Sequence, residues 1–298
     1  MGEQAGGAGS TRAMFRVVRD WPRWLNVEHR NIVTERRVGW LSSLIRRRRR
    51  EGPWVPEYAR TTRIEQQGTK VTILNVRNFT YRTRDDGTPT YYDATYDIEA
   101  VESVDLVVSR WTAESIAHVF LSFGFRDGRY LAISIETRRR QGQRYSPYAG
   151  FLPLYDLIYV VADERDLIGV RTDVRRERVH LFRADIEPAT AQALFADYLR
   201  RVDALDRCPE FYNTLFNNCT TNILHHVRAV APEIGYSWKV LLSGYADRYS
   251  YELGLLGRTL PFEALKAGSL IRRPAGSSVG DLFSKEIRDS LYLAEAVP

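Results

Sequence analysis

Alternating apolar and polar positions dominate the middle of the chain. From about residue 70 to 184, β-branched and aromatic residues recur at every second position, and turn residues separate the runs. This is the pattern of half-buried strands. The runs are Lys70–Val76, Ser103–Arg110, Ala117–Phe125, Arg129–Glu136, Leu154–Val161 and Arg178–Ala184. The alternation predicts a mainly antiparallel sheet.

The pattern becomes helical after Glu187-Pro188. Apolar residues then recur at helical spacing as Leu194, Phe195, Tyr198, Leu199, Val202 and Leu205. They predict an amphipathic helix that packs on the sheet. A second helix is predicted to begin near Cys219 and to end before Pro232. Helical segments follow toward the C-terminus, with a loop over Pro274–Gly280. Strands followed by helices indicate an α+β fold, a mainly antiparallel sheet packed against helices.

The two ends of the chain differ from this central region. Residues 1–60 are rich in Arg and Trp, and the apolar cluster Val38–Ile45 runs directly into Arg46–Arg50. We predict an N-terminal arm or linker, either solvated or in peripheral contact with lipid headgroups. Residues 61–272 are predicted to form the main folded domain, and residues 273–298 a C-terminal tail. The 298 residues, 44% of them hydrophobic, suffice for one large domain with appendages.

Composition and motifs limit the classes of partner and cofactor that the protein is expected to bind. The net charge of +6, with positive charge almost all from arginine, favours anionic partners such as phospholipid headgroups, cell-wall polymers or nucleic acid, and composition does not choose among them. No motif points to nucleic acid, and no glycine pattern predicts a nucleotide cofactor. No stretch approaches the roughly 18 apolar residues of a membrane span, and no signal peptide is visible. We therefore expect no nucleic acid and no cofactor.

The two cysteines, Cys208 and Cys219, lie eleven positions apart and predict neither a disulfide framework nor a zinc pair. Asn218 is a good N-cap, which places Cys219 in the first turn of its helix. The positive end of the helix dipole favours thiolate there, and the free N–H groups of that turn can stabilise an oxyanion. The alternative is that Cys219 is a small buried core residue.

His118 is the candidate base. Alternation along its strand puts His118 on the face opposite Val119 and Leu121. A three-residue turn at Arg126-Asp127-Gly128 matches the apolar faces of this strand and the next. That register sets Glu136 opposite His118, with Ser134 one step diagonal as an alternative orienter of the imidazole. A two-residue Asp-Gly turn would instead bring Thr137 opposite His118.

Three further residues are candidates for substrate binding. Asn218 and Thr220 flank the cysteine, and Arg138, with Arg139, Arg140 and Arg144, could hold an anionic group. His225 and His226 follow Cys219 on its helix, so that one must face away from the other. Because recognisable further ligands are missing, we predict no metal site.

Several spaced motifs together resemble one family. They are Ile116-Ala117-His118 with Ser122-Phe123-Gly124-Phe125, Leu131 to Arg138, Tyr159 to Ile168, and Tyr212-Asn213 with Asn217 to Ile223. Over about residues 70–272 the chain resembles the Lnb N-terminal periplasmic domain family. That family looks related to circularly permuted NlpC-like papain folds, as in lecithin retinol acyltransferase, in which the histidine strand precedes the cysteine helix. The order of His118 and Cys219 agrees with that arrangement.

The resemblance implies a cysteine acyltransferase or hydrolase of the bacterial envelope, with Cys219 as nucleophile, His118 as base, and Ser134 or Glu136 as third residue. The Lnb group is associated with N-acylation of lipoproteins, so a phospholipid or lipoprotein substrate is expected. A peptidoglycan or peptide amidase and a non-catalytic envelope-binding domain are the alternatives. The expected location is the periplasm or envelope, with the cytoplasm as alternative because no export signal is visible. Relatives generally carry membrane-spanning segments, whereas this chain shows only the Arg-rich arm.

Overall fold

An eight-stranded sheet organises the protein. The computed structural model describes residues 53–84, 86–143, 154–273, 279–289 and 291. The strands of the main sheet are β1 (Arg63–Gln67), β2 (Lys70–Arg77), β5 (Tyr91–Asp97), β6 (Val101–Arg110), β7 (His118–Phe125), β8 (Tyr130–Arg138), β9 (Asp156–Ala162) and β10 (Arg178–Arg183). Their order is β1-β2-β9-β8-β7-β6-β10, with β5 paired to β2. Neighbours are antiparallel except for β2 and β9, which are parallel. β3 (Thr80–Thr83) and β4 (Asp86–Thr88) form a separate two-stranded sheet.

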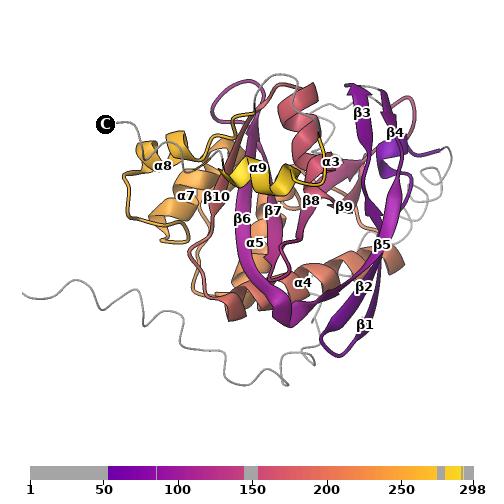
Figure 1. Ribbon diagram of the computed structural model, residues 1–298, viewed down its shortest axis with the longest axis horizontal. Helices are drawn as coiled ribbons and strands as arrows, with labels where there is room; N and C mark the ends of the chain where they lie inside the picture. The colour runs from indigo at the N-terminus through magenta and orange to yellow at the C-terminus, as the bar shows by residue number, and fades with distance from the viewer. Residues whose placement is uncertain (1–52, 85, 144–153, 274–278, 290, 292–298) are drawn as a thin grey trace, which may run out of the picture.

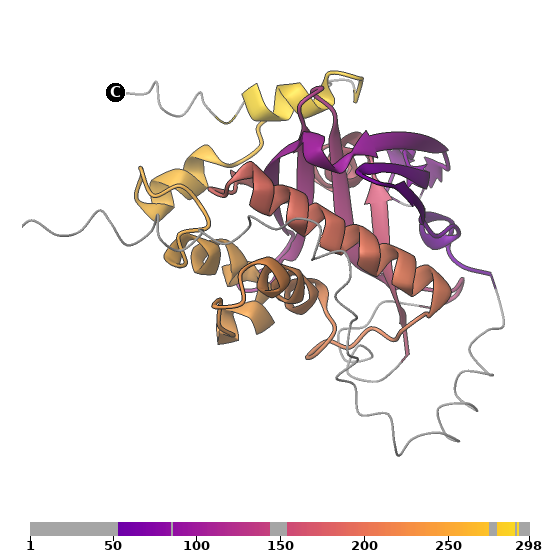
Figure 2. The same ribbon diagram turned by 90° about the horizontal axis from the view of Figure 1, so that it is seen from below.

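Helices cover both faces of the sheet. The long helix α4 (Pro188–Arg207) and α5 (Cys219–Val230) lie on one face, and α3 (Glu164–Gly169) and α9 (Phe283–Asp289) on the other (Figure 1, Figure 2). The shorter helices α6 (Trp238–Leu241), α7 (Ala246–Glu252) and α8 (Phe262–Gly268) follow α5. The mixed α+β class and the mainly antiparallel sheet are thus confirmed.

Strand alternation divides the core into two layers. On β7, Val119, Leu121 and Phe123 belong to the cluster that contains the buried residues of α4. Phe120 belongs to the other cluster, with residues of α3 and α9. Because successive side chains of a strand point to opposite faces, His118 starts the strand on the Phe120 side. The predicted separation of His118 from the main apolar face is confirmed.

The turn between β7 and β8 sets the register of the site. The amide of Gly128 donates to the carbonyl of Phe125, and Gly128 has a φ of +83°, a left-handed conformation that glycine adopts without strain. The pairing runs from Gly124 opposite Tyr130 to Leu121 opposite Ile133. Continued by three residues, this register sets Glu136 opposite His118, as the three-residue turn predicted.

The predicted strands and two main helices are all present, with ends shifted by a few residues. The sequence pattern missed β1, β3, β4 and β5, which are short or largely exposed, and it missed α3. Most of the predicted loop over Pro274–Gly280 and residues 1–52 of the predicted arm lie outside the described residues.

Both ends of the described chain contact the sheet. Trp54 forms a bridge with Arg140 next to β8. In α9, the guanidinium of the buried Arg288 contacts Glu164 at 2.7 Å and Asp105 at 2.6 Å. Phe283 and Ile287 of α9 are fully buried beside α3. Segments of the predicted arm and tail are therefore part of the packed unit, while the domain boundaries at residues 61 and 272 remain predictions. Among the described residues, no helix is long and apolar enough to cross a bilayer.

Candidate active site

The capping of α5 positions Cys219. The Asn218 side chain accepts a hydrogen bond from the Thr221 amide at 2.8 Å, and the Thr221 hydroxyl accepts one from the Asn218 amide at 2.9 Å. This reciprocal capping box fixes the start of the helix at Cys219. Cys219 is thereby held in the first turn, where backbone N–H groups have no partner within the helix and the helix dipole favours an anion.

His118 is oriented from one side by two groups of β8. Its Nε2 atom lies 2.6 Å from Ser134 Oγ and 3.0 Å from Glu136 Oε1. The Ser134 hydroxyl donates to Glu136 Oε1 at 2.8 Å, so its oxygen accepts from His118 Nε2–H. The two candidates for the third residue therefore act together. The sequence suggested them as alternatives. In the structure, the fully buried Ser134 hydrogen-bonds to both His118 and Glu136, and Glu136 also contacts His118 directly.

Cys219 occupies the other side of the imidazole. Its thiol is hydrogen-bonded to His118. Since Nε2 of His118 contacts Ser134 and Glu136, Nδ1 is the nitrogen left available to the thiol. The Val119 amide also hydrogen-bonds to Cys219. The structure thus brings together all four predicted catalytic residues, Cys219, His118, Ser134 and Glu136.

The charges of this cluster favour an imidazolium and thiolate pair. Burial would lower the pKa of His118, but the charge of Glu136 and the hydrogen bond from Cys219 outweigh it and raise that pKa to about 9. Burial would raise the pKa of the Cys219 thiol, but His118 and the Val119 amide outweigh it, so this pKa lies below its ordinary value. Burial would likewise raise the pKa of Glu136, yet His118 and Arg171 hold it well below the ordinary range. Thiolate is the nucleophilic form of cysteine.

Arg171 is a member of the site that sequence reasoning missed. It lies in a short π-helix, Val170–Val174, that directly follows α3. Its guanidinium donates to Glu136 Oε1 at 3.0 Å and to the Leu167 carbonyl at 2.7 Å, and packs over the Phe120 ring. The only hint in the sequence is a single arginine directly after an apolar run. Arg171 fixes the carboxylate that orients His118, although its charge opposes protonation of the imidazole.

Replacing Arg171 with methionine is expected to destabilise the fold by about 1 to 3 kcal/mol, because a buried carboxylate and a carbonyl each lose a donor. It should also raise the pKa of His118 above about 9, since a positive charge near the imidazole is removed. Chemical denaturation and an NMR titration of the His118 imidazole measure the two effects. Arg175→Met, an exposed change one turn further on, is the matched control. An unchanged pKa of His118 would contradict this prediction.

Asn218 and Thr220 have structural partners. Besides the cap, Asn218 Nδ2 donates to the Thr214 carbonyl at 2.7 Å. The Thr220 hydroxyl donates to the Val240 carbonyl and ties α5 to α6. Both side chains are buried. Their predicted role in substrate binding thus rests on the backbone of the turn rather than on free side-chain groups.

Asn218→Ala is expected to cost about 1 kcal/mol of stability through loss of the cap, and to slow alkylation of Cys219 as the first turn frays. Asn218→Ser keeps a capping oxygen and serves as the control. Denaturation midpoints and labelling rates of both variants check the prediction. Equal stability of Asn218→Ala and the parent would count against the capping box.

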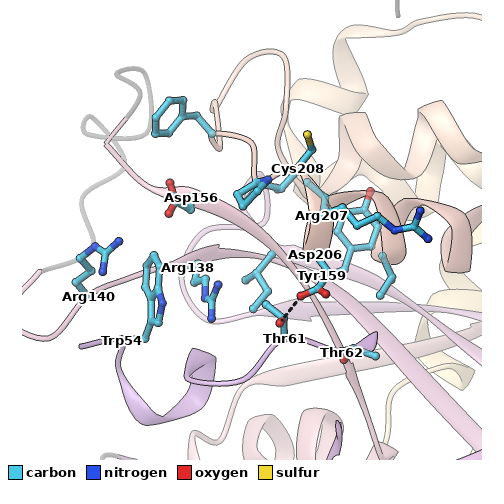
Figure 3. Close-up of a pocket in the computed structure, with 16 residues that line it drawn as sticks. Trp54, Thr61, Thr62, Arg138, Arg140, Asp156, Tyr159, Asp206, Arg207 and Cys208 are labelled. Carbon is cyan, nitrogen blue, oxygen red and sulfur yellow. Dashed lines mark hydrogen bonds between the residues drawn. The ribbon is translucent and has the colours of Figure 1, made fainter. Parts of the chain in front are cut away.

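Arg138 contacts other residues than the dyad of Cys219 and His118. Its Nε and Nη2 atoms donate to the carbonyls of Tyr58 and Ala59, at 2.9 and 3.2 Å. Arg138 and Arg140 flank Trp54, with guanidinium carbons 4.2 and 3.9 Å from its ring centroids (Figure 3). They line a pocket of about 340 Å³ whose rim includes the exposed Cys208. Neither of these two hydrogen bonds reaches Cys219 or His118, and the role of Arg138 as an anion holder remains a prediction. Arg144 lies outside the described residues.

A second polar network, around the buried His226, links α5 to α4 and β9. Burial lowers the pKa of His226, so the neutral ring donates through Nδ1 to Asp197 at 2.6 Å and accepts at Nε2 from the Tyr159 hydroxyl at 2.8 Å. The Tyr159 hydroxyl also lies 3.2 Å from the Asn222 carbonyl oxygen. His226 is buried while His225 is exposed, as their spacing predicted. This network joins α4, α5 and β9, which fixes the helix that carries Cys219.

Metal-ligating side chains do not gather in the described part of the chain, where no group of three or more His, Cys, Asp or Glu residues could hold an ion.

Comparison with known proteins places the chain in a family. The family model described as the Lnb N-terminal periplasmic domain matches residues 87–244, which include β7, β8 and the start of α5. Neither the curated proteins nor the solved structures yielded a match. The matched segment spans more than half of the chain and contains Cys219, His118, Ser134 and Glu136. The chain therefore belongs to the Lnb N-terminal periplasmic domain family.

Proposed function

We propose that this protein is a cysteine-dependent acyltransferase of the bacterial cell envelope, in which Cys219 carries the acyl group as a thioester. The observation that carries the proposal is the contact of the Cys219 thiol with an imidazole whose far nitrogen is held by Ser134 and Glu136. A nucleophile, a base and an orienting group are the parts that covalent catalysis needs. The order of β7 before α5 suits a circularly permuted papain-like core.

In the first half-reaction, the thiolate of Cys219 attacks the carbonyl carbon of an acyl ester. A carbon–sulfur bond forms, and the resulting oxyanion lies near the first-turn N–H groups of α5. The carbon–oxygen bond of the ester then breaks, and the alkoxide leaving group takes the proton from His118. The products are a Cys219 thioester, a free alcohol and a neutral imidazole.

In the second half-reaction, an amine attacks the thioester. His118 accepts the proton that the nitrogen loses, while a carbon–nitrogen bond forms and the carbon–sulfur bond breaks. Thiolate and imidazolium are thereby restored. Glu136 stays ionised throughout because His118 and Arg171 hold its pKa low. With water as the acceptor, the same steps give hydrolysis.

An apolar groove beside α5 supports a lipid as the acyl donor. It has a volume of about 450 Å³, and most of its lining is apolar or aromatic. The lining residues are Leu215, Phe216, Thr221, Leu224, His225, Arg228, Tyr236 and Leu241. Thr221 lies two positions after Cys219 on the same helix. An apolar hollow on the helix that carries the nucleophile suits an acyl chain better than a peptide, which needs convergent polar groups.

The family description supports action in the periplasm. We propose a phospholipid or a lipoprotein ester as the acyl donor. We further propose N-acylation of a lipoprotein amine as the second half-reaction.

Intact-mass analysis after incubation with a short-chain phospholipid tests the proposal. We expect a mass increase of one acyl chain, located on the Cys219 peptide, released by hydroxylamine and absent from Cys219→Ser. A lipoprotein-derived peptide with a free amino terminus should then remove the acyl group and gain its mass. Cleavage of a peptidoglycan or peptide amide without any acyl adduct would instead favour the amidase. If neither reaction occurs with folded protein, the proposal fails.

A further inference from the structure

Large apolar side chains project into solvent on and near the segments that precede His118 and Cys219. Phe216 is 75% exposed and Trp238 is 57% exposed, which is unusual for residues of this size. Ile116, Leu215, Leu241 and Leu242 are each between 39% and 48% exposed. We call these six residues the apolar collar.

The collar comes from three segments, two of which lie shortly before His118 and Cys219 in the sequence. Leu215 and Phe216 lie shortly before Cys219, and they line the groove together with Leu241. Ile116 lies two positions before His118. The segment after Leu242 runs beside it, because the Ser243 hydroxyl donates to the Ala117 carbonyl at 2.6 Å and the Gly244 amide donates to Ser115 at 3.1 Å.

The charges within this surface are positive. Lys239, between Trp238 and Leu241, is the charged residue of the segment 236–242, and Arg228 is the charged residue of the groove lining. Lys239 also contacts Glu252. No carboxylate is among the collar or groove residues. Trp, Phe and Leu beside basic residues are the combination found where proteins contact the interface of an anionic bilayer.

We infer that the apolar collar docks the domain on an anionic phospholipid bilayer, with Phe216 and Trp238 inserted at the level of the headgroups. The groove then faces the membrane, and an acyl chain can enter it without crossing water. The inference assigns the bilayer contact to the folded domain, separately from the Arg-rich arm. It does not require catalysis, so that docking and chemistry can fail independently.

Vesicle sedimentation of the full chain tests the docking. The parent carries Cys219→Ser so that lipid turnover cannot change the vesicles, which contain either phosphatidylglycerol with phosphatidylethanolamine or phosphatidylcholine alone. We expect tighter binding to the anionic vesicles, and about tenfold or greater loss of that binding for Phe216→Ser with Trp238→Ser. Each single variant should lose part of it. Leu282→Ser, at a residue 65% exposed beside α9, is the matched control and should bind as the parent does.

Equal binding of the parent and the double variant would overturn the inference, as would an equal loss in Leu282→Ser. The same proteins are compared by sedimentation equilibrium without lipid. A concentration-dependent dimer that the double variant loses, without a change in vesicle binding, would show that the collar is covered by a second copy and would also overturn it. Because both side chains project into solvent, the variants should fold, and circular dichroism verifies this.

Discussion

Cys219→Ser is expected to lower turnover of an activated acyl ester by about a thousandfold or more and to abolish the acyl-enzyme. The serine hydroxyl keeps the size of the side chain but is far less ionised than a thiol beside the same imidazole. No covalent intermediate should then accumulate. Initial rates with an alkyl p-nitrophenyl ester, together with intact-mass spectra at early times, measure both effects.

Cys208→Ser is the matched control, because Cys208 is the exposed thiol and lies on the rim of a different pocket. It should leave turnover unchanged. If Cys219→Ser retained ester turnover and Cys208→Ser lost it, the nucleophile would be Cys208, which would contradict the proposal. An effect of neither change would mean that the esterase signal does not arise from a thiol.

His118→Ala is expected to slow alkylation of Cys219 by about 10- to 100-fold at about pH 5.5 and to change it much less at about pH 9. Below its pKa of about 9, His118 is the cation that holds Cys219 as a thiolate. Without it, burial of the thiol dominates and the thiolate forms only at higher pH. Thiolates of higher pKa are also more nucleophilic, so the difference between the two proteins shrinks, or reverses, in alkali.

The measurement is the rate of mass gain with iodoacetamide between about pH 5 and 10. His225→Ala removes an exposed imidazole from the same helix as Cys219 and should leave the profile unchanged. A His118→Ala profile parallel to that of the parent at every pH would show that the imidazole does not activate the thiol.

Alternation along β7 and β8 was enough to predict the fold around the site. The apolar faces must meet, which limits the turn to an odd number of residues, and Gly128 can adopt the left-handed conformation that such a turn requires. From that register follows the contact of Glu136 with His118. The helix start at Cys219 was also predictable, because Asn218 and Thr221 carry a local capping signal.

Long-range partners were not predictable in the same way. Nothing local to residue 171 indicates that its guanidinium reaches Glu136, since the contact depends on how α3 packs against β8. Likewise, Ser134 and Glu136 could be ranked as alternatives from spacing, but only the positions of their oxygens show that both contact Nε2 of His118. The edge strands β1, β3 and β4 lacked a signal because their side chains are mostly exposed and show little alternation.

The contacts of the Arg-rich run could not be predicted from the sequence, and the role of Arg138 as an anion holder stays a prediction. The run that contains Arg138 suggested an anion site next to the dyad, yet its guanidinium holds backbone carbonyls at Tyr58 and Ala59. A charged side chain with a long stem can reach several partners, and the sequence does not show which one it meets.

The most direct test of the account compares the two thiols of the wild-type protein in one experiment. Intact protein is treated with dilute iodoacetamide at about pH 6, and the labelled peptides are quantified over time. The account predicts that Cys219, although only 8% exposed, reacts faster than the exposed Cys208, because it is held as a thiolate by His118. Faster labelling of Cys208, with Cys219 unreactive until the protein unfolds, would mean that Cys219 is an ordinary core residue.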